Sequence, residues 1–127
     1  MVSLGYFHNM YTIRIIEGEI TKPELRRMAE EIFGDMVKGT ADITKDTMAL
    51  GGEMHIDSNQ LLLDTGSEQQ NVWGFNIYPD QPVESWIEYN SLVNIKPVLG
   101  NRSPDILDAS VREKIKDIVL KHVSLHE

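Results

Sequence analysis

The sequence predicts an α+β fold, a single domain with a mainly antiparallel sheet and two principal helices at about residues 22–33 and 111–123. In both segments apolar residues recur at helical spacing. Between them the pattern changes to short apolar runs that are β-branched or alternate with period two. The turns between these runs are short, which favours hairpins and therefore antiparallel pairing.

The first elements are a strand and a helix. The run from Tyr11 to Ile16 is β-branched and predicts a strand, preceded by an N-terminal extension at residues 1–10, with the single domain spanning residues 11–127. A capping box then begins the first helix, because Thr21 can accept from the third helical amide while Glu24 reaches back to the amide of the cap. The helical apolar positions are Leu25, Met28, Ala29, Ile32 and Phe33.

A hairpin follows, with strands predicted over residues 36–43 and 48–57. We expect Ile43 to pair with Met48, a register that places Lys38 opposite Glu53 as a favourable pair of charges. Further segments complete the sheet and the second helix. Strands are predicted at 72–78, 85–89 and 92–95, a strand or helical turn at 61–63, and a second capping box at Ser110 and Glu113.

The net charge of the chain, −8, is concentrated in its middle. Residues 35–90 hold ten acids against two bases, Lys38 and Lys45, and the rest of the chain is balanced. This distribution points to a cation as partner and away from nucleic acid. There is no cysteine, which excludes thiolate chemistry, and neither a signal peptide nor a spanning helix is expected, so we expect a cytoplasmic protein without a membrane partner.

The acids of the predicted strand 48–57 form the candidate site. Glu53, His55 and Asp57 alternate along it and would share one face. Carboxylate oxygens are the ligands that calcium prefers, whereas an imidazole is a poorer one. We therefore predict a divalent cation site, most simply for Ca²⁺, with Glu53 and Asp57 as first ligands and Asp35 and Asp64 as further ones.

Two other functions are open at this point. The acidic face could meet a basic patch of a protein partner, which makes the chain a non-enzymatic interaction module. A metal-dependent hydrolase with His55 as general base is the third possibility. An EF-hand is disfavoured because Thr47 replaces the glycine of the loop. An aspartic protease is disfavoured because the stretch between Gly66 and Gly100 is too short for the flap and strands it would need.

Six short segments carry a resemblance: ITKPEL (residues 20–25), FGDMVK (33–38), GGEMHID (51–57), WGFNIYP (73–79), WIE (86–88) and GNRS (100–103). In order and spacing the chain resembles a family of short archaeal and bacterial proteins of unknown function, from about Ile13 to Val123. The resemblance implies an α+β domain and calcium binding at an acidic pocket, and it supplies no catalytic residues. The family usually has an acid-Asp-Gly-Ser stretch where this chain has Asp64-Thr65-Gly66-Ser67.

Overall fold

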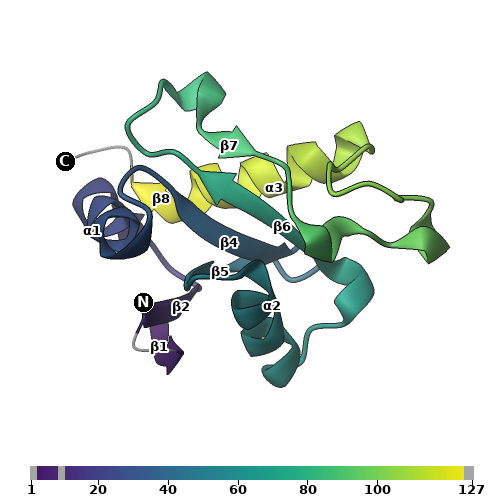
Figure 1. The fold of residues 1–127 in the computed structure, drawn as a ribbon, viewed down its shortest axis with the longest axis horizontal. Helices are drawn as coiled ribbons and strands as arrows, with labels where there is room; N and C mark the ends of the chain where they lie inside the picture. Colours follow the sequence, from purple (N-terminus) through teal and green to yellow (C-terminus); the bar gives the residue numbers. More distant parts are fainter. Residues whose placement is uncertain (1–2, 9–10, 125–127) are drawn as a thin grey trace.

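The computed structural model describes the backbone of residues 3–8 and both backbone and side chains of residues 11–124. These residues form three layers, with a central antiparallel sheet between helices α1 and α3 on one face and helix α2 on the other (Figure 1). The helices are α1 (Lys22–Ile32), α2 (His55–Asp64) and α3 (Ala109–His122). The predicted α+β class with an antiparallel sheet is confirmed.

The main sheet has the strand order β1-β2-β5-β4-β6-β7, and every neighbouring pair in it is antiparallel. A separate parallel pair, β3 and β8, joins the start of α1 to the end of α3. The strands are β1 (Ser3–His8), β2 (Tyr11–Ile16), β3 (Ile20–Thr21), β4 (Val37–Asp42), β5 (Thr47–Gly51), β6 (Val72–Ile77), β7 (Ile87–Glu88) and β8 (Val123–Ser124). Four 3₁₀ turns complete the description: η1 (Gln69–Asn71), η2 (Val83–Ser85), η3 (Leu92–Asn94) and η4 (Pro97–Leu99).

The two predicted helices are confirmed, although one of the two caps differs. At α1 the predicted capping box is present, with the Glu24 amide donating to the Thr21 hydroxyl at 3.2 Å and the Thr21 amide donating to Glu24 Oε1 at 3.2 Å. The Ser110–Glu113 box predicted for α3 is wrong. The N-cap is Asp108, whose carboxylate accepts from the Ser110 amide at 2.8 Å.

The β4–β5 hairpin forms as expected but in another register. The ladder pairs Ala41, not Ile43, with Met48, a shift of two residues. The physical reason is the turn, in which Asp42 Oδ1 accepts from the amides of Thr44 and Lys45 and so ends β4 early. The predicted pairing of Lys38 with Glu53 is therefore absent.

The prediction of a strand over residues 48–57 is wrong for the second half of that segment. Gly51 and Gly52 have φ values of 107° and 84°, a left-handed backbone that suits glycine and turns the chain out of the sheet. Helix α2 then begins at His55 and continues through residues 61–63, for which a helical turn was one of the two expectations. Glu53 therefore lies in a turn, and His55 and Asp57 lie in the first turn of α2. The three side chains do not share the face of a strand.

The remaining segments agree in part with the sequence. The strand predicted at 72–78 is β6, the one at 85–89 shortens to β7, and residues 92–95 form the 3₁₀ turn η3 instead of a strand. Residues 3–8 of the expected N-terminal extension form β1 at the edge of the sheet. The other residues of that segment lie outside the described part of the chain.

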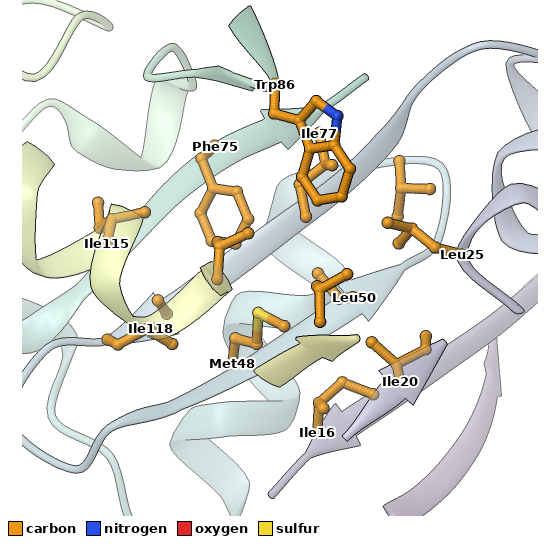
Figure 2. Close-up of a cluster of buried hydrophobic side chains, with 14 of the residues drawn as sticks. Ile16, Ile20, Leu25, Met48, Leu50, Phe75, Ile77, Trp86, Ile115 and Ile118 are labelled. Atoms are coloured by element: carbon orange, nitrogen blue, oxygen red, sulfur yellow. The ribbon is translucent and has the colours of Figure 1, made fainter. Parts of the chain in front are cut away.

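The larger hydrophobic core lies between the sheet and the layer of α1 and α3. Figure 2 shows Phe75 and Ile77 of β6 beside Trp86, with Leu25 of α1 and Ile115 of α3 at either side. A smaller cluster lies under α2, where Leu61 and Leu62 pack on the opposite face of the sheet. Toward β6 this second face changes character, because the buried side chains there are polar or absent: Thr40, Ser58, Gly74, Asn76, Ser91 and Asn94.

Candidate functional site

The exposed apolar side chains gather on one part of the surface. Nine large hydrophobic side chains are exposed in the described part of the chain, and seven of them line three adjoining pockets. The most exposed are Leu92 at 74% and Val98 at 83%. We call this surface the apolar groove, and its seven apolar residues are Met54, Ile56, Leu92, Ile95, Val98, Leu99 and Leu107.

The groove begins at the N-terminal end of α2 and ends at the start of α3. Its first pocket, of about 460 Å³, lies between α2 and η3. The middle pocket, of about 310 Å³, is lined by η3, η4 and part of η1, and shares Ile56 and Leu92 with the first. The third, of about 560 Å³, shares Leu99 and Gln70 with the middle one and reaches Asp108. The shared walls make the three pockets one continuous surface.

A buried asparagine holds one wall of the groove on the sheet. The Asn94 side chain is fully buried, and its Nδ2 donates to the Gly74 carbonyl at 2.9 Å while its Oδ1 accepts from the Gly74 amide at 2.7 Å. Nδ2 also lies 3.1 Å from the Pro104 carbonyl, which it can reach as a second acceptor. The amide group of Asn94 therefore ties η3 to β6 and to the loop that precedes α3.

A second buried asparagine, Asn101, closes the same loop on itself. Its Nδ2 lies 2.8 to 3.0 Å from the carbonyls of Asn94, Ser103 and Asp105, which share its two hydrogens. Its Oδ1 accepts from the Leu107 amide. Hydrogen bonds of this kind replace the regular ladder that an irregular segment lacks. The apolar side chains of η3 and η4 are thus presented by a fixed backbone, although no strand or long helix carries them.

Gly74 makes the close approach of this loop possible. A Cβ atom at this position would lie 2.6 Å from the Ser91 side chain and 2.8 Å from Val93, which is closer than real Cβ contacts allow. The absence of a side chain on β6 at this point lets η3 pack directly on the strand. In the sequence, the only sign of this close approach was Gly74 itself, a glycine in the middle of an apolar strand.

The first pocket has a polar end built around His55. The His55 Nε2 lies 2.9 Å from the Phe75 carbonyl, and Lys38, Asn76 and Asn90 line the same pocket. Burial of the ring, and secondarily the charge of Lys38, lowers the pKa of His55 below its ordinary value, against the raising effects of the Phe75 carbonyl, Asn76 and Glu88. His55 is therefore held in its neutral form at neutral pH.

Asn76 links this polar end to the edge of the sheet. Its Nδ2 donates to Glu88 Oε1 at 2.8 Å, and the hydroxyl of Tyr78 donates to the same carboxylate oxygen at 3.2 Å. The Asn76 Oδ1 is buried and accepts no hydrogen bond of standard geometry. The Asn76 side chain nevertheless lies close enough to His55 to raise the pKa of that ring. The carboxylate of Glu88 remains exposed at the rim.

The four predicted cation ligands lie in different parts of the fold. Asp35 follows α1, Glu53 lies in the turn before α2, and Asp57 and Asp64 lie in the first turn and at the last residue of α2. Asp64 lies seven positions after Asp57 along the helix, a rise of about 10 Å. Among residues 11–124 no three His, Asp or Glu side chains come together in a group that could hold a metal ion. Cation binding by these residues stays a prediction.

Sequence reasoning found His55 but missed the groove. It assigned no functional role to Leu92, Val98 and Leu107. The available signal was three apolar residues that lie outside any predicted helix or strand, Val98, Leu99 and Leu107. Among the described residues no helix is long and apolar enough to cross a membrane.

The protein is thus a small α+β domain that carries a continuous apolar groove on its surface. The chain belongs to a family of proteins of unknown function, DUF5674, whose sequence model matches residues 14–122. This confirms the resemblance to a family of unknown function and its extent along the chain. No match is found among curated proteins or among solved structures.

Proposed function

We propose that this protein is an interaction module that binds an apolar segment of another polypeptide in the apolar groove. The observation that carries the proposal is the gathering of seven of the nine exposed large hydrophobic side chains on three adjoining pockets. Contiguous apolar surface in a concave setting is the usual property of a binding site, whereas single exposed apolar residues need no explanation.

The charge of the chain supports a partner segment that carries basic residues beside its apolar ones. The net charge is −8, and it favours the approach of a positively charged polypeptide over long distances. Exposed carboxylates stand near the two ends of the groove, with Glu88 beside the polar end of the first pocket and Asp108 in the wall of the third. They can pair with lysine or arginine side chains on either side of an apolar stretch.

The fixed backbone of the loop supports the same proposal. The hydrogen bonds of Asn94 and Asn101 hold η3 and η4 in place, so the apolar side chains need not be ordered at the moment of binding. Preorganised surfaces bind more tightly because less conformational entropy is lost. A flexible connecting loop does not require two buried asparagine side chains whose amide groups both donate and accept hydrogen bonds.

A synthetic amphipathic peptide, with leucines at helical spacing and lysines elsewhere, tests the proposal by titration and backbone NMR. We expect chemical-shift changes confined to the lining of the groove, mainly α2, η1 and residues 90–108. Binding should be weakened at least about tenfold, or 1.4 kcal/mol, in Leu92→Ser and in Val98→Ser. Val83→Ser is the matched control, because Val83 is also exposed but lies outside the groove.

Two outcomes would contradict the proposal. The first is peptide binding that maps to another face and is unchanged by Leu92→Ser. The second is a dimer of the protein, observed by sedimentation and lost in Leu92→Ser, because the groove would then be occupied by a second copy of this chain. Leu92→Ser and Val98→Ser both replace exposed side chains, so the unfolding free energy of each variant should stay within about 0.5 kcal/mol of that of the parent.

Divalent cation binding is the second candidate, favoured by the ten acids against two bases in residues 35–90. Since the predicted ligands Glu53, Asp57, Asp35 and Asp64 are dispersed, a Ca²⁺ ion held by one or two of them would take its remaining ligands from backbone carbonyls and water. Calcium should then raise the melting temperature, and Glu53→Gln or Asp57→Asn should weaken that effect while Glu113→Gln should not. An unchanged melting temperature in excess Ca²⁺ excludes this candidate.

A further inference from the structure

Lys96 is a buried lysine that no carboxylate neutralises within the described residues. It is 7% exposed, its ammonium donates to the Gln69 carbonyl at 2.7 Å, and it lies 5.2 Å from the centre of the Trp73 ring. One carbonyl and one ring face satisfy only part of a group that carries three N–H donors. Lysine is rarely buried in this way, because an ammonium loses its hydration without gaining a counter-charge.

The physical consequence is a more reactive amine. Burial lowers the pKa of Lys96, although the Gln69 carbonyl and the Trp73 ring both favour the ammonium form. A larger fraction of Lys96 is therefore a neutral amine at a given pH than for an exposed lysine. The neutral amine has a free electron pair and is a nucleophile, whereas the ammonium is not.

The middle pocket of the groove supplies a place for a reactant. Lys96 lines this pocket together with apolar side chains, and its volume of about 310 Å³ suits a small molecule. The other walls are Ile56, Leu92, Val93, Ile95, Pro97, Val98 and Leu99, with Gln69 and Gln70 at one side. An aliphatic chain of a few carbons fits such surroundings better than a charged or strongly polar group.

We propose that Lys96 forms an imine with aliphatic aldehydes or ketones that enter the middle pocket. The electron pair of the neutral Nζ forms a bond to the carbonyl carbon, and the carbonyl oxygen takes up a proton as the nitrogen loses one. The resulting carbinolamine then loses its hydroxyl as water, with a second proton from the nitrogen, and a carbon–nitrogen double bond remains. No oxidant or reductant is needed, and water reverses the reaction.

This inference does not depend on the polypeptide partner proposed above. It concerns a covalent reaction of one side chain, and it is measured without any peptide. Peptide binding is measured without any aldehyde, so failure of one leaves the other standing. The two share only the walls of the middle pocket.

Reductive trapping with hexanal and cyanoborohydride at neutral pH, followed by peptide mass spectrometry, tests the proposal on the unmodified protein. Cyanoborohydride reduces an imine to a stable secondary amine, so the alkylated lysine records where the imine formed. We expect Lys96 to be alkylated about tenfold faster than the exposed Lys114 and Lys116 of α3. In denaturant the difference should disappear, because it arises from the folded pocket.

Lys96→Arg is the matched variant, since arginine keeps a donor for the Gln69 carbonyl and a charge near Trp73 but forms no imine under these conditions. Total fast alkylation should fall to the level of the exposed lysines in this variant. Alkylation of Lys96 at the same rate as Lys114, or more slowly, overturns the proposal and assigns Lys96 a structural role in joining η1 to the loop.

Discussion

The side chain of Asn94 pairs with the backbone of Gly74 in the manner of a neighbouring strand. Its amide group donates to the Gly74 carbonyl and accepts from the Gly74 amide, at 2.9 and 2.7 Å. Within the described residues β7 pairs only with Asn76 and Ile77, so this part of β6 is an edge that a strand does not cover. A single asparagine covers it and at the same time attaches the loop that carries the groove.

Asn94→Ala should destabilise the protein by about 3 kcal/mol, because the Gly74 amide and carbonyl would be left buried without partners. Asn94→Asp is the informative companion variant, since it keeps the acceptor and loses the donor. Urea denaturation measures both. A change below about 1 kcal/mol for Asn94→Ala would mean that water replaces the side chain and that the loop does not depend on it.

The end of α3 is held by His122 more than by its neighbour Lys121. The two ring nitrogens of His122 lie 2.5 Å from the Gly18 carbonyl and 2.9 Å from the Asp46 carbonyl, and the residue is buried. Lys121 forms an exposed ion pair with the Asp46 carboxylate. We expect His122→Leu to cost about 2 kcal/mol of unfolding free energy and Lys121→Ala less than about 1 kcal/mol. Equal effects of the two substitutions would contradict this ranking.

The assignment of Asp108 as the N-cap of α3 can be tested directly. Asp108 accepts from the Ser110 amide and the Ser110 hydroxyl, and these bonds are the main reason that its pKa is lowered. Asp108→Ala should therefore lower the melting temperature more than Ser110→Ala does. The opposite order would restore Ser110 as the cap.

His55 should make the stability of the protein sensitive to mild acid. Its pKa is lowered in the folded state, mainly by burial, so the unfolded chain binds the proton more readily. The contribution of His55 is complete above its ordinary pKa of 6.5 and is lost as the pH falls from that value toward the lowered one. His55→Gln should remove this loss. Denaturation curves of both proteins across this pH range check it, and parallel curves would exclude His55 as the cause.

A second acidic window should open at lower pH through Glu24. The hydrogen bonds from Thr21 lower the pKa of Glu24 below its ordinary value of 4.5, so its contribution is lost only below that value. The two groups can therefore be distinguished by the pH at which stability falls. The variant His55→Gln leaves the Glu24 window unchanged.

The parts of the fold that were predictable are those in which local sequence and tertiary structure agree. Helix α1 has a capping box, a helical apolar spacing and a terminating glycine, and all three are properties of neighbouring residues. Helix α2 also ends before a left-handed glycine, Gly66, but it has neither the capping box nor the helical apolar spacing. Its N-cap Met54 offers no side-chain acceptor, and its buried residues include Ser58 and Asn59.

The helical state of α2 is determined by distant partners instead. Ser58 receives a hydrogen bond from Thr40 of β4, and Asn59 forms a reciprocal pair with Gln69. Such contacts cannot be inferred from spacing, which is why the alternation of Glu53, His55 and Asp57 predicted a strand and a cation site on one face. The groove was hidden for the same reason, because its walls are brought together by the long-range hydrogen bonds of Asn94 and Lys96.

Residues 90–108 are held in place from their buried side, which leaves their outward-facing side chains free to differ among members of the family. The groups that hold residues 90–108 in place are amides directed at the interior, whereas the side chains that face outward from η3 and η4 contribute little to that attachment. Leu92, Val98 and Leu99 can therefore be exchanged for other residue types at small cost to folding. For the proposed interaction module, this means that the residues that contact the partner can change while the architecture beneath them stays the same.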